Sequence, residues 1–257
     1  MIYSYYPGCT LKDRAKELDL CARASAEKLG IELRELPDWQ CCGAVYPQAS
    51  DEIASRLSAV RSLMHAEGTL VTMCSACHHV LKRTNYDWNH DEHFRTSATN
   101  YMEETYDGST NVVHFLELLR DVIGFENLKK KIVKPLTGRK IGAFYGCMVL
   151  RPSKELAFDD PENPQIIENF IRALGAEPVK YAYRNECCGA YVGLEDKAAA
   201  QEQVHKAVRS AICAGAKELV TACPLCRYNL VENAVGEKLP VKYFTELLAE
   251  ALGVEVG

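Results

Sequence analysis

The tripeptide Cys-Cys-Gly occurs twice in this chain, within WQCCGAVY at residues 39–46 and within ECCGAYVG at residues 186–193. Each copy has one cysteine upstream and a C-x-x-C pair downstream. The two copies read C-x31-CC-x31-C-x2-C and C-x39-CC-x34-C-x2-C. Ten of the 12 cysteines belong to this pattern: Cys9, Cys41, Cys42, Cys74, Cys77, Cys147, Cys187, Cys188, Cys223 and Cys226. The repetition predicts a duplicated fold that carries a duplicated thiol site.

Composition narrows the class of protein. A chain of 257 residues is long enough to bury a core as one or two domains. The formal net charge of -5 argues against a nucleic-acid partner, which would favour a basic surface. Lys12, Asp13 and Arg14 interrupt the N-terminus before a signal-peptide core could form, and no apolar stretch approaches the length of a membrane span.

We therefore expect a cytoplasmic protein, in a compartment where thiols stay reduced. Cysteines at fixed spacing are then metal ligands or redox groups rather than structural disulfides.

Apolar periodicity predicts the same order of elements in both halves. Strands are expected at 2–7, 31–36, 69–73, 140–145, 177–183 and 217–222, and at the start of 111–124 and of 241–253. Helices are expected at 12–29, 50–65, 163–174 and 195–214, after the first C-x-x-C to about residue 84, and at the ends of 111–124 and 241–253. The polar segment 85–110 is hard to place, with one possible helix over 91–105.

Strands that alternate with helices imply parallel sheets with right-handed crossovers. The predicted fold class is α/β, with two pseudo-symmetric lobes that are each a small parallel sheet flanked by helices. We expect a first lobe at residues 1–137 and a second at 138–257, joined by the basic stretch 126–138.

Four of the cysteines follow predicted strands directly: Cys9, Cys74, Cys147 and Cys223. Ligands of parallel sheets bind beyond the carboxyl ends of the strands, so the five cysteines of each half should converge at one sheet edge. Four glycines beside the cysteines are assigned to cofactor binding, two for close backbone approach and two for a sharp turn after the pair. These are Gly8 and Gly146, and Gly43 and Gly189.

Five thiolates in each half exceed the four ligands of a zinc site and the four of a standard cubane. That count favours an iron–sulfur cluster with an extended core. Zinc at the C-x-x-C pairs would leave the Cys-Cys pairs unexplained, and vicinal disulfides are a further alternative. The CSACH stretch at 74–78 matches a haem c attachment pattern, but the second half has Arg227 at the matching position.

Other cysteines and histidines lie outside the repeat. Cys21 and Cys213 are expected to be small buried apolar side chains on helices. His90 and His93 form a pair in a polar segment and are expected to be solvated. Next to the first C-x-x-C, the neighbouring His78 and His79 are candidate proton donors.

The doubled cysteine pattern, from YYPGC at 5–9 to CPLCRYNL at 223–230, resembles the CCG domain of the heterodisulfide reductase B subunit over nearly the whole chain. The resemblance implies that each five-cysteine set holds a noncubane [4Fe-4S] cluster, so that two such clusters are the cofactors and the catalytic groups. It further implies that a disulfide is cleaved between the two clusters across a cleft between the lobes.

The resemblance also implies partners. These are a flavin-containing A subunit and a ferredoxin-like C subunit, with a small disulfide or a thiol carrier as substrate; the archaeal substrate is the mixed disulfide of coenzyme M and coenzyme B. A second class of function stays open, because other CCG proteins belong to dehydrogenase complexes. In that alternative the chain passes electrons onward, for example to a quinone, without bond chemistry at its clusters.

Overall fold

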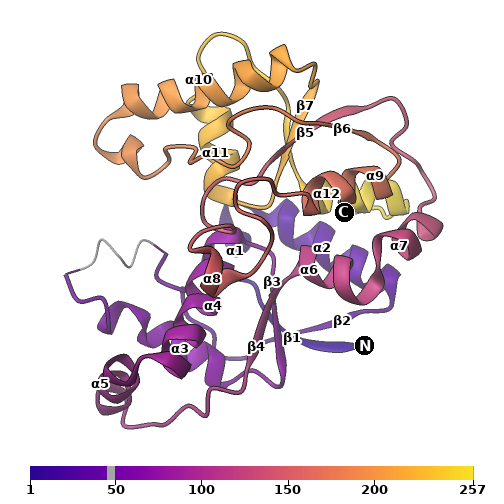
Figure 1. Ribbon diagram of the computed structural model, residues 1–257. Coiled ribbons are helices and arrows are strands. Elements are labelled where there is room, and N and C mark those ends of the chain that lie inside the picture. Colours follow the sequence, from indigo (N-terminus) through magenta and orange to yellow (C-terminus); the bar gives the residue numbers. More distant parts are fainter. Residues whose placement is uncertain (45–49, 257) are drawn as a thin grey trace.

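The computed structural model describes residues 1–44 and 50–256, and within them the chain forms two four-stranded parallel sheets. The strand orders are β2-β1-β3-β4 and β6-β5-β7-β8, so the second sheet repeats the first. Figure 1 shows the two lobes one above the other, with the indigo-to-magenta first lobe below the orange-to-yellow second lobe. The predicted fold class is confirmed.

The strands are short, and the central ones of each sheet, β1, β3, β5 and β7, are largely buried. Those of the first sheet are β1 (Ile2–Tyr6), β2 (Glu32–Glu35), β3 (Thr69–Thr72) and β4 (Asn111–His114), and those of the second are β5 (Lys140–Phe144), β6 (Glu177–Val179), β7 (Glu218–Thr221) and β8 (Val241–Tyr243). The central pairs share a register, with Ser4 opposite Leu70 in the first sheet and Gly142 opposite Leu219 in the second.

The helices of the first half are α1 (Cys9–Asp13), α2 (Lys16–Leu29), α3 (Leu57–Met64), α4 (Ser75–His90), α5 (Glu92–Met102), α6 (Phe115–Leu118) and α7 (Phe125–Lys131). Those of the second half are α8 (Ser153–Leu156), α9 (Ile166–Ala173), α10 (Lys197–Cys213), α11 (Pro224–Glu232) and α12 (Phe244–Leu252). Short 3-10 turns at Ala54–Arg56 and Val192–Leu194 and a π-helical turn at Leu119–Ile123 complete the elements. Within the described ranges, no helix is long and apolar enough to cross a membrane.

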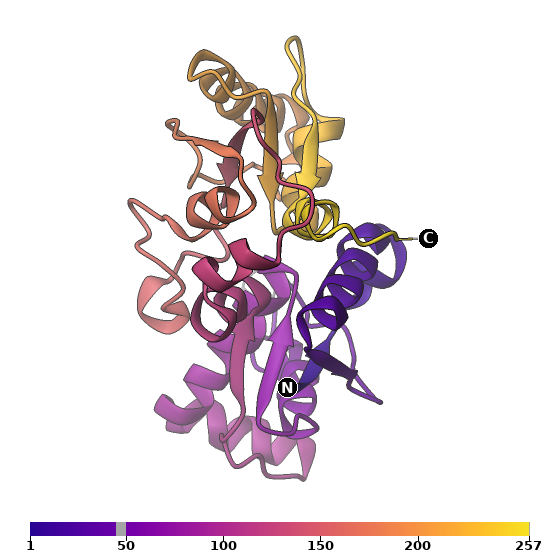
Figure 2. The same cartoon turned by 90° about the vertical axis from the view of Figure 1, so that its right-hand side faces the viewer.

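The two lobes are joined by a crossed packing of helices. The first long helix after the opening strand of each lobe packs on the last helices of the other: α2 contacts α12, and α9 contacts α6 and α7. In Figure 2, α2 and α12 lie side by side where the lobes meet. The buried hydroxyl of Thr245 in α12 donates to the carbonyl of Leu18 in α2 at 3.0 Å. One hydrophobic core runs through both lobes, and a second cluster lies within the second lobe.

The pattern of α2 explains its place in this interface. Leu18, Ala22 and Ala26 recur at four-residue spacing and are buried, so they form one apolar face. Gly30 ends the helix in the left-handed conformation, with φ of 79°.

Several predicted boundaries shift. The helix expected at 12–29 is two helices, because α1 begins at Cys9 and α2 only at Lys16. In the polar segment 85–110, α4 continues to His90 and α5 follows. The helix expected from residue 163 begins at Ile166, because Asp159 accepts the backbone N–H groups of Gln165 and Ile166. Strand β6 is shorter than the predicted 177–183.

Candidate metal centre

The five cysteines of the first half form a row at the carboxyl edge of the first sheet. Cys9 begins α1 just after β1, and its sulfur lies 3.4 Å from the sulfur of Cys41. Cys42 follows, with its sulfur 3.6 Å from that of Cys77. Cys41 and Cys42 also shift each other's pKa values, as do Cys77 and Cys74 at the end of β3, so these thiols are close neighbours. The predicted convergence at one sheet edge is what the fold produces.

The second half builds the same row in the same order. Its thiols lie near enough to shift one another's pKa values, with Cys147 acting on Cys187, Cys187 on Cys188, Cys188 on Cys226 and Cys226 on Cys223. The members have matching burial. The first cysteine and the first of the adjacent pair are the accessible ones in both rows, whereas the other three are buried.

The glycines leave the space that the last cysteine side chain of each row occupies. At Gly8 (φ of 74°) a Cβ would lie 2.7 Å from the sulfur of Cys77, and at Gly146 (φ of 67°) it would lie 2.9 Å from the sulfur of Cys226. The last cysteine of each row thus occupies the space that a side chain would need. Gly43 turns the chain at φ of 71°, and its Cβ would meet the carbonyl of Ser55 at 2.6 Å.

Hydrogen bonds among the thiols separate their pKa values. Interaction with the thiol of Cys41 and then with that of Cys77 lowers the pKa of Cys42 well below that of an ordinary thiol, and the pKa of Cys41 rises correspondingly. In the second row the pKa is lowered at Cys187, by interaction with Cys147 and Cys188, and also at Cys223, by interaction with Cys226. Each row therefore carries thiolate character at its Cys-Cys pair, which is the form that binds metal.

The first row lines a cavity of about 220 Å³ between the lobes. All five of its cysteines contribute to the wall, and the second lobe adds Tyr191, Pro224 and Leu225. Among the described residues, no three His, Cys, Asp or Glu side chains surround one point as ligands of a single ion would. A row of five soft donors beside a cavity fits an extended metal–sulfur group better than one zinc ion.

The two rows lie close to each other at the lobe junction. The backbone N–H of Ser75, next to Cys74, donates to the carbonyl of Ala222, next to Cys223, at 3.1 Å. The residue that matches Ser75 in the second lobe is Pro224, which has no backbone N–H to donate to the carbonyl of Met73. On that side the imidazole Nε2 of His114 is paired with the carbonyl of Met73 at 2.9 Å.

Of the two histidines proposed as proton donors, His78 is fully buried and its Nε2 lies 3.5 Å from a carboxylate oxygen of Glu117. Burial lowers its pKa well below the usual value, so it is neutral at physiological pH. His79 crosses the lobe junction, where its Nδ1 lies 3.0 Å from the carbonyl of Met148. His79 therefore connects the first C-x-x-C to the residue that follows Cys147.

The two cysteines outside the repeat differ from each other. Cys21 is buried in α2, as expected, and burial raises its pKa to about 11. Cys213 is exposed at the end of α10, so the expectation that it is buried is wrong. None of the 12 cysteines, all of which lie within the described ranges, forms a disulfide.

Sequence reasoning missed Tyr191. Its side chain lines the cavity of the first row although it belongs to the second Cys-Cys-Gly loop. The sequence does contain a signal for this residue. The second loop reads CCGAYV where the first reads CCGAVY, so the tyrosine stands one position closer to the cysteine pair in the second copy.

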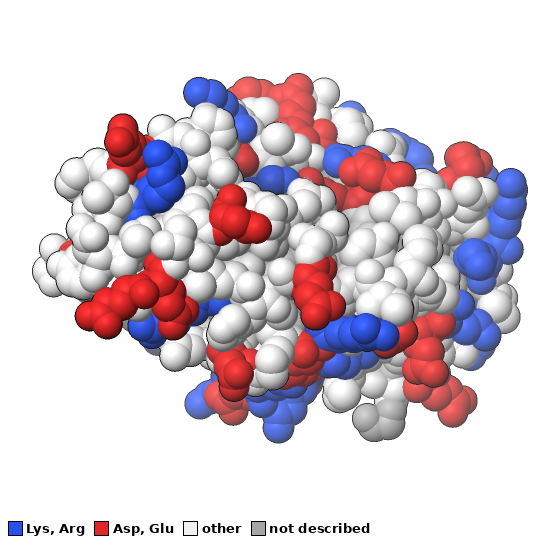
Figure 3. Space-filling model, turned by 90° about the horizontal axis from the view of Figure 1, so that it is seen from below, with Lys and Arg blue, Asp and Glu red and all other residues white. Residues whose placement is uncertain are grey.

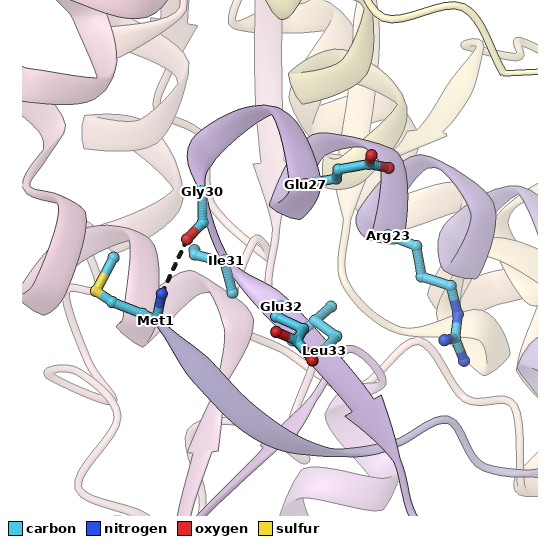
Figure 4. A pocket seen from close by; sticks show the side chains of 7 residues that line it. All are labelled: Met1, Arg23, Glu27, Gly30, Ile31, Glu32 and Leu33. Atoms are coloured by element: carbon cyan, nitrogen blue, oxygen red, sulfur yellow. Dashed lines mark hydrogen bonds between the residues drawn. The ribbon is translucent and has the colours of Figure 1, made fainter.

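The surface has further hollows besides the cavity of the first cysteine row. One of about 540 Å³ adjoins the cavity, since both share Thr10, Pro224 and Leu225, and it is also lined by Arg14 and Arg227. Another, of about 500 Å³, lies at the amino ends of β1 and β2, away from the cysteines. Figure 4 shows this second hollow, with the amino group of Met1 donating to the carbonyl of Gly30 at 3.1 Å.

The surface in Figure 3, seen from below the first lobe, intersperses Lys and Arg with Asp and Glu and shows no continuous basic area on that face.

A family model for the cysteine-rich CCG domain matches the chain at residues 3–82 and again at 141–231. The chain belongs to the CCG cysteine-rich domain family. Two copies of the domain account for the duplicated sheets and for the two cysteine rows.

Curated relatives extend over nearly the whole chain. The 8-methylmenaquinol:fumarate reductase membrane anchor subunit of Wolinella succinogenes is 33% identical over 98% of this chain and 92% of its own length. The B subunit of the ferredoxin/F420H2-dependent CoB–CoM heterodisulfide reductase of Methanosarcina acetivorans is 29% identical over 97% of this chain and 89% of its own length. These relatives support an iron–sulfur subunit with an oxidoreductase role inside a complex.

A solved structure shares the fold. The crystal structure of a hypothetical protein from Helicobacter pylori matches 99% of this chain with a TM-score of 0.77 at 11% identity, and the chain spans about half of that structure. At this identity the likeness concerns the fold.

Proposed function

We propose that this chain is the catalytic iron–sulfur subunit of a heterodisulfide reductase-like complex, which reduces a disulfide or a persulfide between two noncubane [4Fe-4S] clusters. The observation that carries the proposal is the pair of equivalent five-cysteine rows, which meet at the lobe junction. The halves 1–137 and 138–257 would each hold one cluster, through the ten cysteines of the rows.

The chain's own residues supply the setting. The lowered pKa values of Cys42 and Cys187 favour metal binding. Gly8 and Gly146 leave room for the last thiol of each row. The clusters, when bound, would supply one-electron transfers, and two of them facing one bond match the two electrons that a disulfide needs.

The proposal includes a flavin-containing A subunit and a ferredoxin-like C subunit as electron donors, by analogy with the heterodisulfide reductase relatives. It also includes a reducing compartment such as the cytoplasm, because 12 free cysteines suit one.

The metal content tests the cofactor. Protein purified without oxygen should hold about eight iron atoms and as much acid-labile sulfide per chain, as two four-iron clusters require. Stoichiometric zinc without sulfide would contradict the proposal.

The reaction needs its own test. The complete complex, reduced with methyl viologen, should cleave hydroxyethyl disulfide, glutathione disulfide or a persulfide. The addition of the thiol products should change the EPR spectrum of the oxidised complex.

A second candidate function rests on the Wolinella relative, whose name describes a subunit of a quinol:fumarate reductase. In that case the chain would pass electrons between a quinone and its partner subunits. A complex that reduces menaquinone analogues, but cleaves no disulfide or persulfide, would favour this candidate.

A further inference from the structure

Tyr191 is placed between the two cysteine rows. It follows Cys188 by three residues in the second Cys-Cys-Gly loop, yet its side chain lines the cavity that all five cysteines of the first row line. Burial raises its pKa, and negative charge on Cys223, Cys147, Cys74 and Cys42 raises it further.

The hydroxyl of Tyr191 has a poor partner in this structure. It lies 3.4 Å from the thioether sulfur of Met148, which is only a weak acceptor. A better acceptor that entered the cavity would therefore gain this hydrogen bond at little cost. A tyrosine hydroxyl is protonated at neutral pH, so it acts as a donor and not as an anion that would repel a developing thiolate.

The matching position of the first copy is different. Aligning CCGAVY with CCGAYV puts Val45 opposite Tyr191. Val45 lies outside the described residues, but a valine side chain has no hydrogen-bond donor wherever it is placed. The duplication therefore supplies this hydroxyl to the first row without a counterpart at the same position for the second.

We propose that Tyr191 is a catalytic residue that donates a hydrogen bond to the substrate sulfur lying against the first cysteine row. The inference rests on the proposed function. It adds that the two sulfurs of the substrate are treated unequally, with the negative charge of bond cleavage developing preferentially beside Tyr191.

The reaction balances as RS–SR′ + 2e⁻ + 2H⁺ → RSH + R′SH. The S–S bond breaks and two S–H bonds form, with electrons from the reduced partner subunits and protons from water. A hydrogen bond to a thiolate-like sulfur is stronger than one to a neutral disulfide. Tyr191 therefore stabilises the transition state more than the bound substrate, which raises kcat with little effect on KM.

The test compares Tyr191→Phe with Tyr101→Phe in the complete complex. Tyr101 is an exposed tyrosine of α5 and serves as a matched loss of one phenol oxygen away from the cavity. With methyl viologen as donor and hydroxyethyl disulfide as substrate, Tyr191→Phe should lower kcat by about 10- to 100-fold, the range for one hydrogen bond to a charged acceptor. Its KM and iron content should stay near those of the control.

A binding measurement supplies a second readout. The 2-mercaptoethanol concentration that half-converts the EPR spectrum of the oxidised complex should rise by about the same factor in Tyr191→Phe. An unchanged kcat, or a loss of kcat that merely follows a loss of iron, would overturn the role of Tyr191 while the disulfide reductase function stood. If the wild-type complex cleaves no disulfide, the proposed function and this inference fail together.

Discussion

The two lobes build the same cysteine row with different supporting contacts. In the first lobe, the hydroxyl of Tyr6 donates to the carbonyl of Gln40, and the hydroxyl of Ser58 donates to the carbonyl of Cys41. The second lobe has Phe144 at the position of Tyr6, and its loop is held by Asn229, which donates to the carbonyl of Cys188. Two solutions within one chain show that the order of the thiols, rather than any one loop contact, is the common requirement.

The lobes also differ in length after the first cysteine. The second copy has 39 residues between Cys147 and its Cys-Cys pair, against 31 in the first. Its longer loop carries α8, which packs on α4 of the first lobe (Figure 1), with the ammonium of Lys154 5.8 Å from the ring centroid of Tyr86. The extra chain thus adds a contact between the lobes.

The largest expected effect tests whether the two rows are equivalent in function. Cys42→Ser and Cys188→Ser should each abolish disulfide cleavage, because serine is a harder and poorer ligand and one remaining cluster supplies single electrons to a two-electron bond. Turnover and iron content measured together decide the point. If Cys188→Ser loses the iron of its lobe yet keeps most of its turnover, the second lobe is structural and the paired mechanism is wrong.

A smaller effect is expected from substitution of the glycine that precedes the first cysteine of each row. Gly8→Ala and Gly146→Ala should displace Cys77 and Cys226, since the new Cβ would lie within 2.9 Å of either sulfur. Gly30→Ala is the control, because Gly30 also has a positive φ but no atom within 4 Å of the added Cβ.

The control should lose about 1–2 kcal/mol of unfolding free energy from backbone strain and keep its iron. The two test variants should lose more stability, and the iron of their own lobe as well. Full iron content in Gly146→Ala would show that the second row tolerates a displaced thiol.

A modest effect on the pH dependence of stability is expected at the last strand of the first lobe. This strand, β4, ends at His114, whereas the matching strand β8 of the second lobe ends at Tyr243. Burial lowers the pKa of His114 to about 3, so the folded protein keeps it neutral while the unfolded chain protonates it below about 6.5. Stability from this group is present above pH 6.5 and is lost as the pH falls, because the unfolded state then binds the extra proton.

Between pH 7.5 and 5, wild type should therefore lose about 2 kcal/mol more unfolding free energy than His114→Asn, which keeps a helix-capping side chain. Denaturant titrations at the two pH values measure this difference. Glu117 has a pKa raised by burial, but it is present in both proteins and cancels in the comparison. Equal losses in the two proteins would contradict a neutral buried His114.

The smallest effects belong to the cysteines outside the rows. Cys213→Ser should match wild type in stability, iron content and turnover, because the side chain is exposed. Cys21→Ser should keep iron and turnover but lose about 1 kcal/mol, since a hydroxyl replaces a thiol in the interface between α2 and α12. A loss of iron in either variant would mean that these cysteines take part in the sites.

The fold class and the convergence of the cysteines at the sheet edges followed from the sequence because they depend on short-range signals. Strand periodicity placed Cys9 and Cys74 at strand ends, and parallel topology then brought them to one edge. The contacts across the lobes did not follow from it. Nothing in the sequence of α2 names α12 as its partner, and Tyr191 reaches the first row only through the packing of the two lobes.

The crossed packing of α2 on α12 bears on how such a protein is made. α2 leaves the ribosome early, but the part of its buried surface that contacts α12 is covered only when residues 244–252 have been synthesised. This side of the first lobe therefore stays exposed until translation is nearly complete. Metal loading of the first row would then follow release of the finished chain, and a protein truncated before α12 should fail to hold metal even in the lobe whose cysteines are all present.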